Sequence, residues 1–192
     1  MMFSLKGDQL LSPEKPRPIF VGGIHGVGKS TICSKICTKF KIPHLIAGDI
    51  IRTFKKANSI HHVDQGKLVG DIPVNQDILI SALNEMAITH SFYVLDGHFT
   101  LFDSSAVVHP VPIATFSAMS PVMMFLVVDE PELIQSRLLL RDKVRYCSEI
   151  LSEMQDAEVD HAFMISRSLD IELHKVHSFS EIHAILASHF ES

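Results

Sequence analysis

A run of glycines followed by a lysine and two hydroxyl groups, residues 23–31, is the stretch of this sequence best suited to chemistry. Gly-Ile-His-Gly-Val-Gly-Lys-Ser at residues 23–30 matches the pattern G-x-x-x-x-G-K-[ST], which is typical of loops that bind phosphate groups. Glycine permits backbone conformations that other residues avoid, so successive N–H groups can point at one anion beside the positive end of a helix. The predicted phosphate-binding residues are Gly23, His25, Gly26, Val27, Gly28, Lys29, Ser30 and Thr31.

The side chains at the end of this stretch suit a nucleoside triphosphate with its Mg²⁺. Lys29 can neutralise the β- and γ-phosphates, and Ser30 can offer its hydroxyl to Mg²⁺. Thr31 can add a contact to the α-phosphate. The alternative is an ordinary glycine-rich turn with a surface lysine. An apolar run before the stretch and a helical pattern after it favour phosphate binding.

A second carboxylate stands where it could share that Mg²⁺. The apolar run at residues 92–95 ends at Asp96, which Gly97 follows. Because the carboxyl ends of parallel strands meet over one crevice, Asp96 is expected near the glycine-rich loop. Ser30 and Asp96 are therefore the predicted metal residues, with Asp96 acting through water. A plain aspartate in a turn is the alternative.

Three residues are candidates for binding a second substrate. Asp49 stands where a helix N-cap is expected, and Arg52 follows one turn later on the same face. Arg52 could therefore reach a second phosphate group. His98 follows Asp96 closely and could touch the acceptor or orient a water, although a packed histidine in a turn is an equal alternative.

Three arginines recur at a spacing of four residues on a predicted helix, namely Arg137, Arg141 and Arg145. This spacing puts them on one face, where guanidinium groups could clamp a phosphoryl group during transfer. The alternative is a solvated face on which the arginines pair with carboxylates such as Glu132 or Asp142.

Composition limits the classes of protein that are possible. The chain has 192 residues, 46% hydrophobic and 20% charged, which is typical of a globular domain. A net charge of −5 argues against a protein that coats nucleic acid or an anionic membrane. Three cysteines are too few for a disulfide framework. No apolar stretch approaches a membrane span, and no signal peptide is recognisable, so a reducing cytoplasm is the expected location.

The elements that must position these residues alternate between strand and helix. Strands are predicted at residues 19–21, 44–47, 92–95, 122–128 and 171–176, and helices at 28–40, from 49, 73–89, 131–168 in two pieces, and 179–190. Residues 103–121 are expected to form a long connection with one short helix. The alternation predicts an α/β protein with a mostly parallel sheet covered by helices on both faces. Residues 1–18 are expected to be an N-terminal extension, and residues 19–192 one domain.

At this point the sequence resembles a family, the P-loop nucleoside monophosphate kinases, and among them the archaeal-type adenylate kinases. The resemblance covers most of residues 19–177. It is carried by GGIHGVGKST, GDIIR, VLDGHFTL, LVVDEPELIQSRLLLRD, QDAEVDHA and KVHS. It implies a three-layer α/β/α fold with a five-stranded sheet. It also implies that the base of the donor nucleotide lies near His177 and Ser178.

The resemblance implies transfer of the γ-phosphoryl group of ATP to a nucleoside monophosphate, with Mg²⁺ as cofactor. Lys29, Arg137 and Arg141 would be catalytic. Asp49, Arg52 and His98 would bind the acceptor under a cover of residues 53–72. The sequence lacks the guanine-reading motif of GTPases and the signature of transport ATPases.

One departure leaves another class of protein open. No arginine follows the Asp-Gly pair before Arg137, whereas common adenylate kinases hold the acceptor phosphate with one. The alternative is an ATP-hydrolysing switch or assembly factor that acts on a protein partner, and an exposed apolar patch around residues 107–116 would favour it. A protein partner is therefore possible, whereas a membrane or a nucleic acid is not expected.

Overall fold

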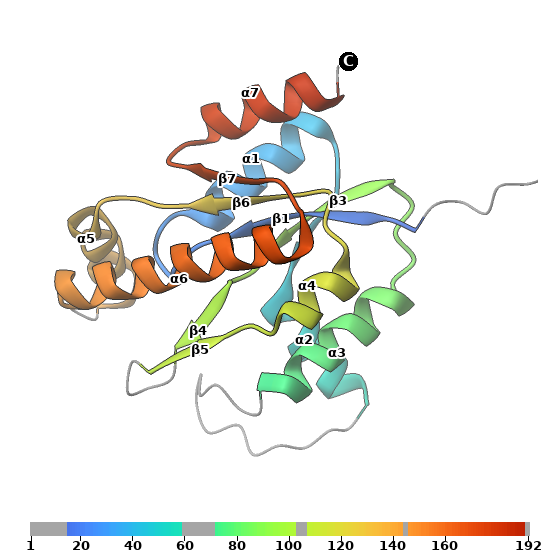
Figure 1. The fold of residues 1–192 in the computed structure, drawn as a ribbon, viewed down its shortest axis with the longest axis horizontal. Coiled ribbons are helices and arrows are strands. Elements are labelled where there is room, and N and C mark those ends of the chain that lie inside the picture. Colours follow the sequence, from blue (N-terminus) through green and yellow to red (C-terminus); the bar gives the residue numbers. More distant parts are fainter. Residues whose placement is uncertain (1–14, 59–71, 103–106, 144–145, 191–192) are drawn as a thin grey trace, which may run out of the picture.

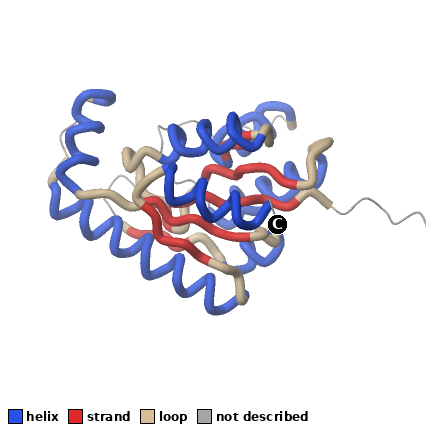
Figure 2. The backbone as a smooth tube through the Cα atoms, turned by 90° about the horizontal axis from the view of Figure 1, so that it is seen from above, coloured by secondary structure: helices blue, strands red, loops and turns tan. Residues whose placement is uncertain are grey.

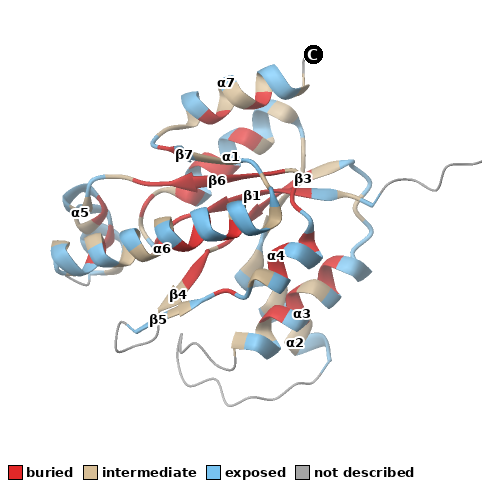
Figure 3. Cartoon of the chain, viewed as in Figure 1, coloured by how far each residue is buried: buried red, intermediate tan, exposed pale blue. Residues whose placement is uncertain are grey.

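A parallel five-stranded sheet forms the middle layer of the protein. The computed structural model describes residues 15–58, 72–102, 107–143 and 146–190 (Figure 1). The strands of the sheet are β1 (Arg17–Gly22), β2 (His44–Ile46), β3 (Phe92–Asp96), β6 (Met123–Val127) and β7 (Leu173–Val176). They lie in the order β2-β3-β1-β6-β7, and every neighbouring pair is parallel. Strand β6 is apolar and buried throughout because helices cover both faces of the sheet (Figure 3).

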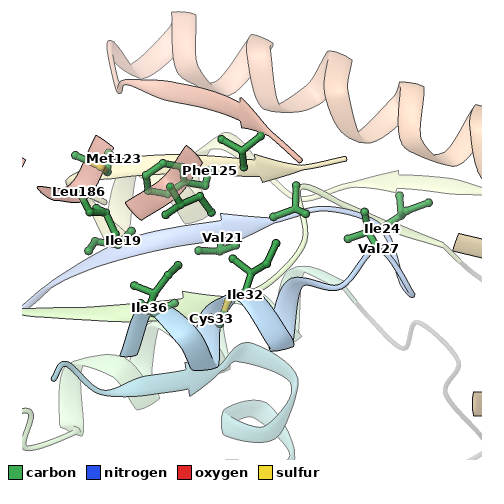
Figure 4. Packing of buried hydrophobic residues seen from close by; sticks show 14 of the residues in the cluster. Ile19, Val21, Ile24, Val27, Ile32, Cys33, Ile36, Met123, Phe125 and Leu186 are labelled. Atoms are coloured by element: carbon green, nitrogen blue, oxygen red, sulfur yellow. The ribbon is translucent and has the colours of Figure 1, made fainter. Parts of the chain in front are cut away.

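Helices α1 (Lys29–Phe40) and α7 (Phe179–Phe190) cover one face of the sheet. Figure 2 shows helices on both sides of the strands. Ile19 and Val21 point to this side and pack with Cys33 and Ile36 of α1 and Leu186 of α7 (Figure 4). The alternate residues of β1 point the other way, as the period of two in a strand requires.

The opposite face is covered by α3 (Ile72–Glu85), α4 (Ile113–Met119) and the long helix α6 (Ser148–Leu169). Phe20 of β1 packs there with Phe116 of α4, and their ring centroids lie 5.1 Å apart. Helix α5 (Pro131–Asp142) follows β6 and lies beside α6. The predicted three-layer α/β/α fold with a five-stranded parallel sheet is confirmed.

Two local expectations were wrong. Helix α2 (Ala47–Ala57) begins directly after β2, so its N-cap is Ile46 and Asp49 lies inside the first turn. Asp49 bonds to Arg52 there instead of capping the helix. The connection after β3 contains an antiparallel hairpin, β4 (Thr100–Phe102) and β5 (Val108–Pro110), before the expected short helix. Strands of three residues carry too little alternation for a sequence pattern to reveal them.

The predicted border between the N-terminal extension and the domain is described only in part. Most of the predicted extension, residues 1–18, lies outside the described residues, and β1 begins at Arg17. The division into an extension and one domain therefore stays a prediction. Within the described residues, none of the helices combines the length and the apolar character that crossing a membrane would require.

Candidate active site

The glycine-rich loop joins β1 to α1 and needs glycine where it turns and where it touches its neighbours. Gly23 and Gly26 have φ angles of 141° and 83°, which L side chains rarely adopt. A Cβ atom at Gly23 would lie 2.5 Å from the carbonyl oxygen of Val127, and one at Gly26 would lie 2.6 Å from Cγ of Leu138. The loop is thus pressed against β6 and α5. The loop leads into the first turn of α1, where no side chain caps the helix and the first N–H groups have no acceptor within the helix.

Lys29 is held inside this loop. Its side chain is 7% exposed, and Nζ donates hydrogen bonds to the carbonyl oxygens of Gly23 at 2.6 Å and Ile24 at 3.1 Å. Burial lowers the pKa of Lys29, and the negative charges of Asp96 and Glu158 oppose that shift. The two hydrogen bonds hold the ammonium group against the loop that would bind the phosphate chain.

Ser30 and Asp96 meet as predicted. The Ser30 hydroxyl donates a hydrogen bond of 2.7 Å to Oδ2 of Asp96. The sheet explains the contact, because Asp96 ends β3 directly beside Val21 of β1, just before the loop. A hydroxyl next to a buried carboxylate at the start of α1 is the donor set that Mg²⁺ prefers. These residues fit the ion that the family implies.

Glu158 of α6 is a part of the site that sequence reasoning missed. Its fully buried carboxylate accepts hydrogen bonds from the backbone N–H groups of Gly23 at 3.0 Å and Phe99 at 2.9 Å. It also accepts from the N–H and the hydroxyl of Thr100, both at 2.5 Å. Burial raises the pKa of Glu158, whereas these hydrogen bonds and Lys29 oppose the shift. Glu158 therefore fastens the first residue of the phosphate loop to the segment that follows β3.

The sequence did carry a signal for Glu158. Leu151, Glu158, Ala162 and Ile165 are buried at helical spacing on one face of α6. A carboxylate on an apolar helical face is buried only where it has partners. The partners come from the loop after β1 and from the segment after β3, far away in the chain, and no local pattern indicates them.

One cavity of about 1090 Å³ joins the phosphate loop to the predicted acceptor side. Its lining includes the predicted residues His25, Gly26, Gly28, Lys29, Ser30, Thr31, Asp49, Arg52, Asp96, His98, Arg137 and Arg141. Gly23 and Val27 are outside the lining. The Val27 side chain is buried in the core instead. His177 and Ser178 are also outside it, and both contact Glu181. Arg145 lies outside the described residues.

The two described arginines of α5 lie at the rim of the loop and are paired. Arg137 donates to the carbonyl oxygen of Val27 at 3.1 Å and to Oδ2 of Asp129 at 2.5 Å. Arg141 forms hydrogen bonds of 2.7 Å with Asp142 and also contacts His25. The hydrogen bond from Arg141 lowers the pKa of Asp142 to about 2. A phosphoryl group would have to compete with these carboxylates for the arginines.

The acceptor side combines charge with an apolar wall. Arg52 is 65% exposed and bonds to Asp49 at 2.9 Å. Burial, followed by the charge of Lys29, holds the pKa of His98 well below its ordinary value of 6.5. The wall is formed by Phe20, Ile51, Leu79, Leu101, Val111, Phe116 and Met119. Gln76 of α3, 8% exposed, lines the same space and was not predicted.

Comparisons with known proteins cover the phosphate loop. A protein family described as "AAA domain" matches residues 22–155. An adenylate kinase of Rickettsia typhi is 37% identical over 86 residues, which are 42% of this chain and 39% of the relative. An adenylate kinase of Encephalitozoon cuniculi is 38% identical over 86 residues, which are 42% of this chain and 46% of the relative. The chain thus spans less than half the length of these curated relatives.

A solved structure is also similar in outline. The crystal structure of a gluconokinase from Sinorhizobium meliloti 1021 aligns with a TM-score of 0.48 and 14% identity over 88% of this chain and 87% of that chain. The family match covers the phosphate loop, Asp96 and the arginines of α5, all of which line the cavity described above. The chain belongs to the AAA-domain family of P-loop proteins and is similar to adenylate kinases over part of its length.

Proposed function

We propose that this chain is an ATP-dependent phosphotransferase that passes the γ-phosphoryl group of ATP to a nucleoside monophosphate. The observation that carries the proposal is that one cavity is lined both by Lys29 and Ser30 of the phosphate loop and by Arg52 of α2 and Gln76 of α3. Direct transfer requires donor and acceptor to share one space in line with each other.

The donor half uses the phosphate loop. The N–H groups at the start of α1 and the Lys29 ammonium would hold the β- and γ-phosphates. Ser30 and Asp96 would hold Mg²⁺, which would neutralise phosphate charge when bound. Lys29 would exchange its bonds to Gly23 and Ile24 for phosphate oxygens. The tether from Glu158 keeps Gly23 in place during this exchange.

The acceptor half suits a phosphate joined to a flat, mostly apolar group. Arg52 could give up its hydrogen bond to Asp49 and bind the acceptor phosphate, since it lines the cavity. The half-buried side chains of Ile51 and Leu101 supply an apolar surface on which a base can pack. Gln76 offers an amide that can donate and accept, which is the complement of a base edge. His98, kept neutral by its low pKa, can also donate or accept there.

The transfer step needs no covalent intermediate. An ionised oxygen of the acceptor phosphate attacks the γ-phosphorus, and the bond from that phosphorus to the β–γ bridging oxygen breaks. The attacking oxygen carries no proton, so a general base is not needed. Arg137 and Arg141 can turn from Asp129 and Asp142 toward the charge that spreads over the transferring group.

A second candidate is the ATP-hydrolysing switch or assembly factor. The observation that favours it is the acceptor side of the cavity, where Arg52 is the one arginine among the described lining residues away from α5. The apolar patch that would also have favoured it is incomplete, since Val107 and Val108 are exposed whereas Val111 and Phe116 are buried.

The test is phosphoryl transfer from ATP·Mg²⁺ to a panel of nucleoside monophosphates and nucleosides, with the products separated by chromatography. Lys29→Ala should abolish transfer to every acceptor. Arg52→Ala should raise KM for the acceptor while leaving KM for ATP unchanged. Slow release of ADP that is independent of any acceptor would support the switch and refute the transferase.

A further inference from the structure

Three potential metal ligands from three elements converge beside the phosphate loop. Cys33 lies on α1, His44 on β2 and Asp96 at the end of β3. Their sulfur, nitrogen and oxygen atoms all lie within 4.8 Å of one another. Nε2 of His44 is 3.8 Å from Oδ2 of Asp96. The parallel pairing of β2 with β3 and the position of Cys33 one turn after Ser30 produce this cluster.

His44 has a polar atom that lacks a partner. Its Nε2 is buried and makes no hydrogen bond. Burying such a nitrogen without a partner costs free energy, so an orphaned group of this kind calls for an explanation. Cys33 is fully buried in the core beside it, on the face of α1 that packs against the sheet (Figure 4).

The chemistry of the three ligands differs from that of a magnesium site. Mg²⁺ takes oxygen ligands in octahedral geometry. A thiolate, an imidazole and a carboxylate form the mixed set that Zn²⁺ binds with three protein ligands and one open position. The Ser30 hydroxyl, 2.7 Å from Oδ2 of Asp96, or a water can fill that position.

We propose that Cys33, His44 and Asp96 bind Zn²⁺ and that this ion excludes ATP·Mg²⁺ from the active site. Binding forms a sulfur–zinc bond, and the thiol proton leaves to solvent. The exclusion follows from Asp96, because Oδ2 is the oxygen beside both Ser30 and His44, and two dications held at that oxygen would repel each other. The exclusion rests on the proposed ATP·Mg²⁺ site, whereas the zinc site itself does not depend on that function.

Competition of this kind is reciprocal. If zinc lowers the affinity for ATP·Mg²⁺ by some factor, ATP·Mg²⁺ must lower the affinity for zinc by the same factor. The site would therefore make the protein an enzyme that free zinc inhibits and that its own substrate protects.

The direct test is a titration of the full chain with Co²⁺, which takes zinc sites and gives a sulfur-to-cobalt charge-transfer band when a thiolate binds it. The wild type should bind one equivalent with this band, and Zn²⁺ should displace the cobalt. Cys33→Ala should lose the band. The double variant Cys37→Ala/Cys147→Ala is the matched control, since it removes two thiols outside the cluster, and it should keep the band.

A second variant covers the case in which Cys33→Ala fails to fold, as circular dichroism would reveal. His44→Gln should weaken cobalt binding by more than about 10-fold while leaving phosphoryl transfer without zinc unchanged. Absence of the band in the wild type, or its survival in Cys33→Ala, overturns the zinc site.

The exclusion is tested separately. Adding ATP·Mg²⁺ should release cobalt from the wild type, and zinc should inhibit turnover of the wild type far more than that of His44→Gln. Cobalt binding that ATP·Mg²⁺ does not affect overturns the exclusion. A chain that binds cobalt as expected and releases it to ATP·Mg²⁺, but phosphorylates no nucleotide, supports this inference and refutes the proposed transferase alone.

Discussion

Replacing Glu158 with glutamine tests whether one buried carboxylate fixes the phosphate loop. The Glu158 oxygens accept four hydrogen bonds, two from the N–H groups of Gly23 and Phe99 and two from Thr100. Glutamine keeps the shape but replaces one acceptor oxygen with an NH₂ group. In the best orientation, the remaining oxygen serves Gly23 and Phe99, and the NH₂ group donates to the Thr100 hydroxyl. The N–H of Thr100 is then left facing another donor.

The size of the effect follows from that single orphaned donor. A buried N–H without a partner costs about 1–3 kcal/mol of unfolding free energy. For a chain of this size, each kcal/mol lowers Tm by about 2–4 °C. The reverse orientation of the amide would orphan Gly23 and Phe99 together, so it costs more. Because Gly23 begins the phosphate loop, the strain should also reach the donor site.

The assay combines chemical denaturation with steady-state kinetics. Glu158→Gln should lower the unfolding free energy by the amount above and raise KM for ATP more than KM for the acceptor. Glu153→Gln is the matched control, since it makes the same change at an exposed position of the same helix and should alter neither quantity. If Glu158→Gln has the stability and the KM for ATP of the wild type, the carboxylate does not hold the loop.

Three further predictions concern other parts of the site. Gly26→Ala should destabilise the fold by about 1–3 kcal/mol more than Gly28→Ala in thermal unfolding. Both glycines have positive φ, but only at Gly26 would a Cβ atom meet Leu138 of α5. Equal losses of stability would show that α5 does not press on the loop. Gln76→Leu should raise KM for the acceptor by about 10-fold or more with KM for ATP unchanged, and no change in either constant would remove Gln76 from the acceptor site. His98→Asn should lose less stability on acidification than the wild type. The pKa of His98 in the folded protein lies below its ordinary value of 6.5. The stability that neutral His98 contributes is therefore complete above pH 6.5 and is lost as the pH falls from 6.5 toward the folded pKa. Parallel pH–stability curves for the two proteins would contradict this shift.

The parts of the site that the sequence predicted are those with local signals. The phosphate loop is a contiguous pattern, and Asp96 could be placed because the ends of parallel strands meet at one edge. The pairing of Ser30 with Asp96 followed from these two facts. The bounds of α7 were predicted as observed, since its apolar spacing is regular.

The parts that were missed depend on contacts between distant segments. Glu158 is a site residue because α6 buries it beside the loop after β1, and Gln76 because α3 places it in the wall of the cavity. The sequence of neither helix alone indicates these surroundings. Asp49 had the residue type of an N-cap, but β2 leads into α2 without the turn that a cap would occupy. The β4–β5 hairpin was missed because its strands are too short to show a period.

The measurement that tests the central claim most directly follows the labelled γ-phosphate of ATP in the wild type and in Lys29→Ala. The account predicts that the label appears on a nucleoside monophosphate and that Lys29→Ala lowers this rate by at least about 10²–10³-fold while the fold stays intact. Label that appears only as inorganic phosphate, or transfer that survives Lys29→Ala, would contradict it.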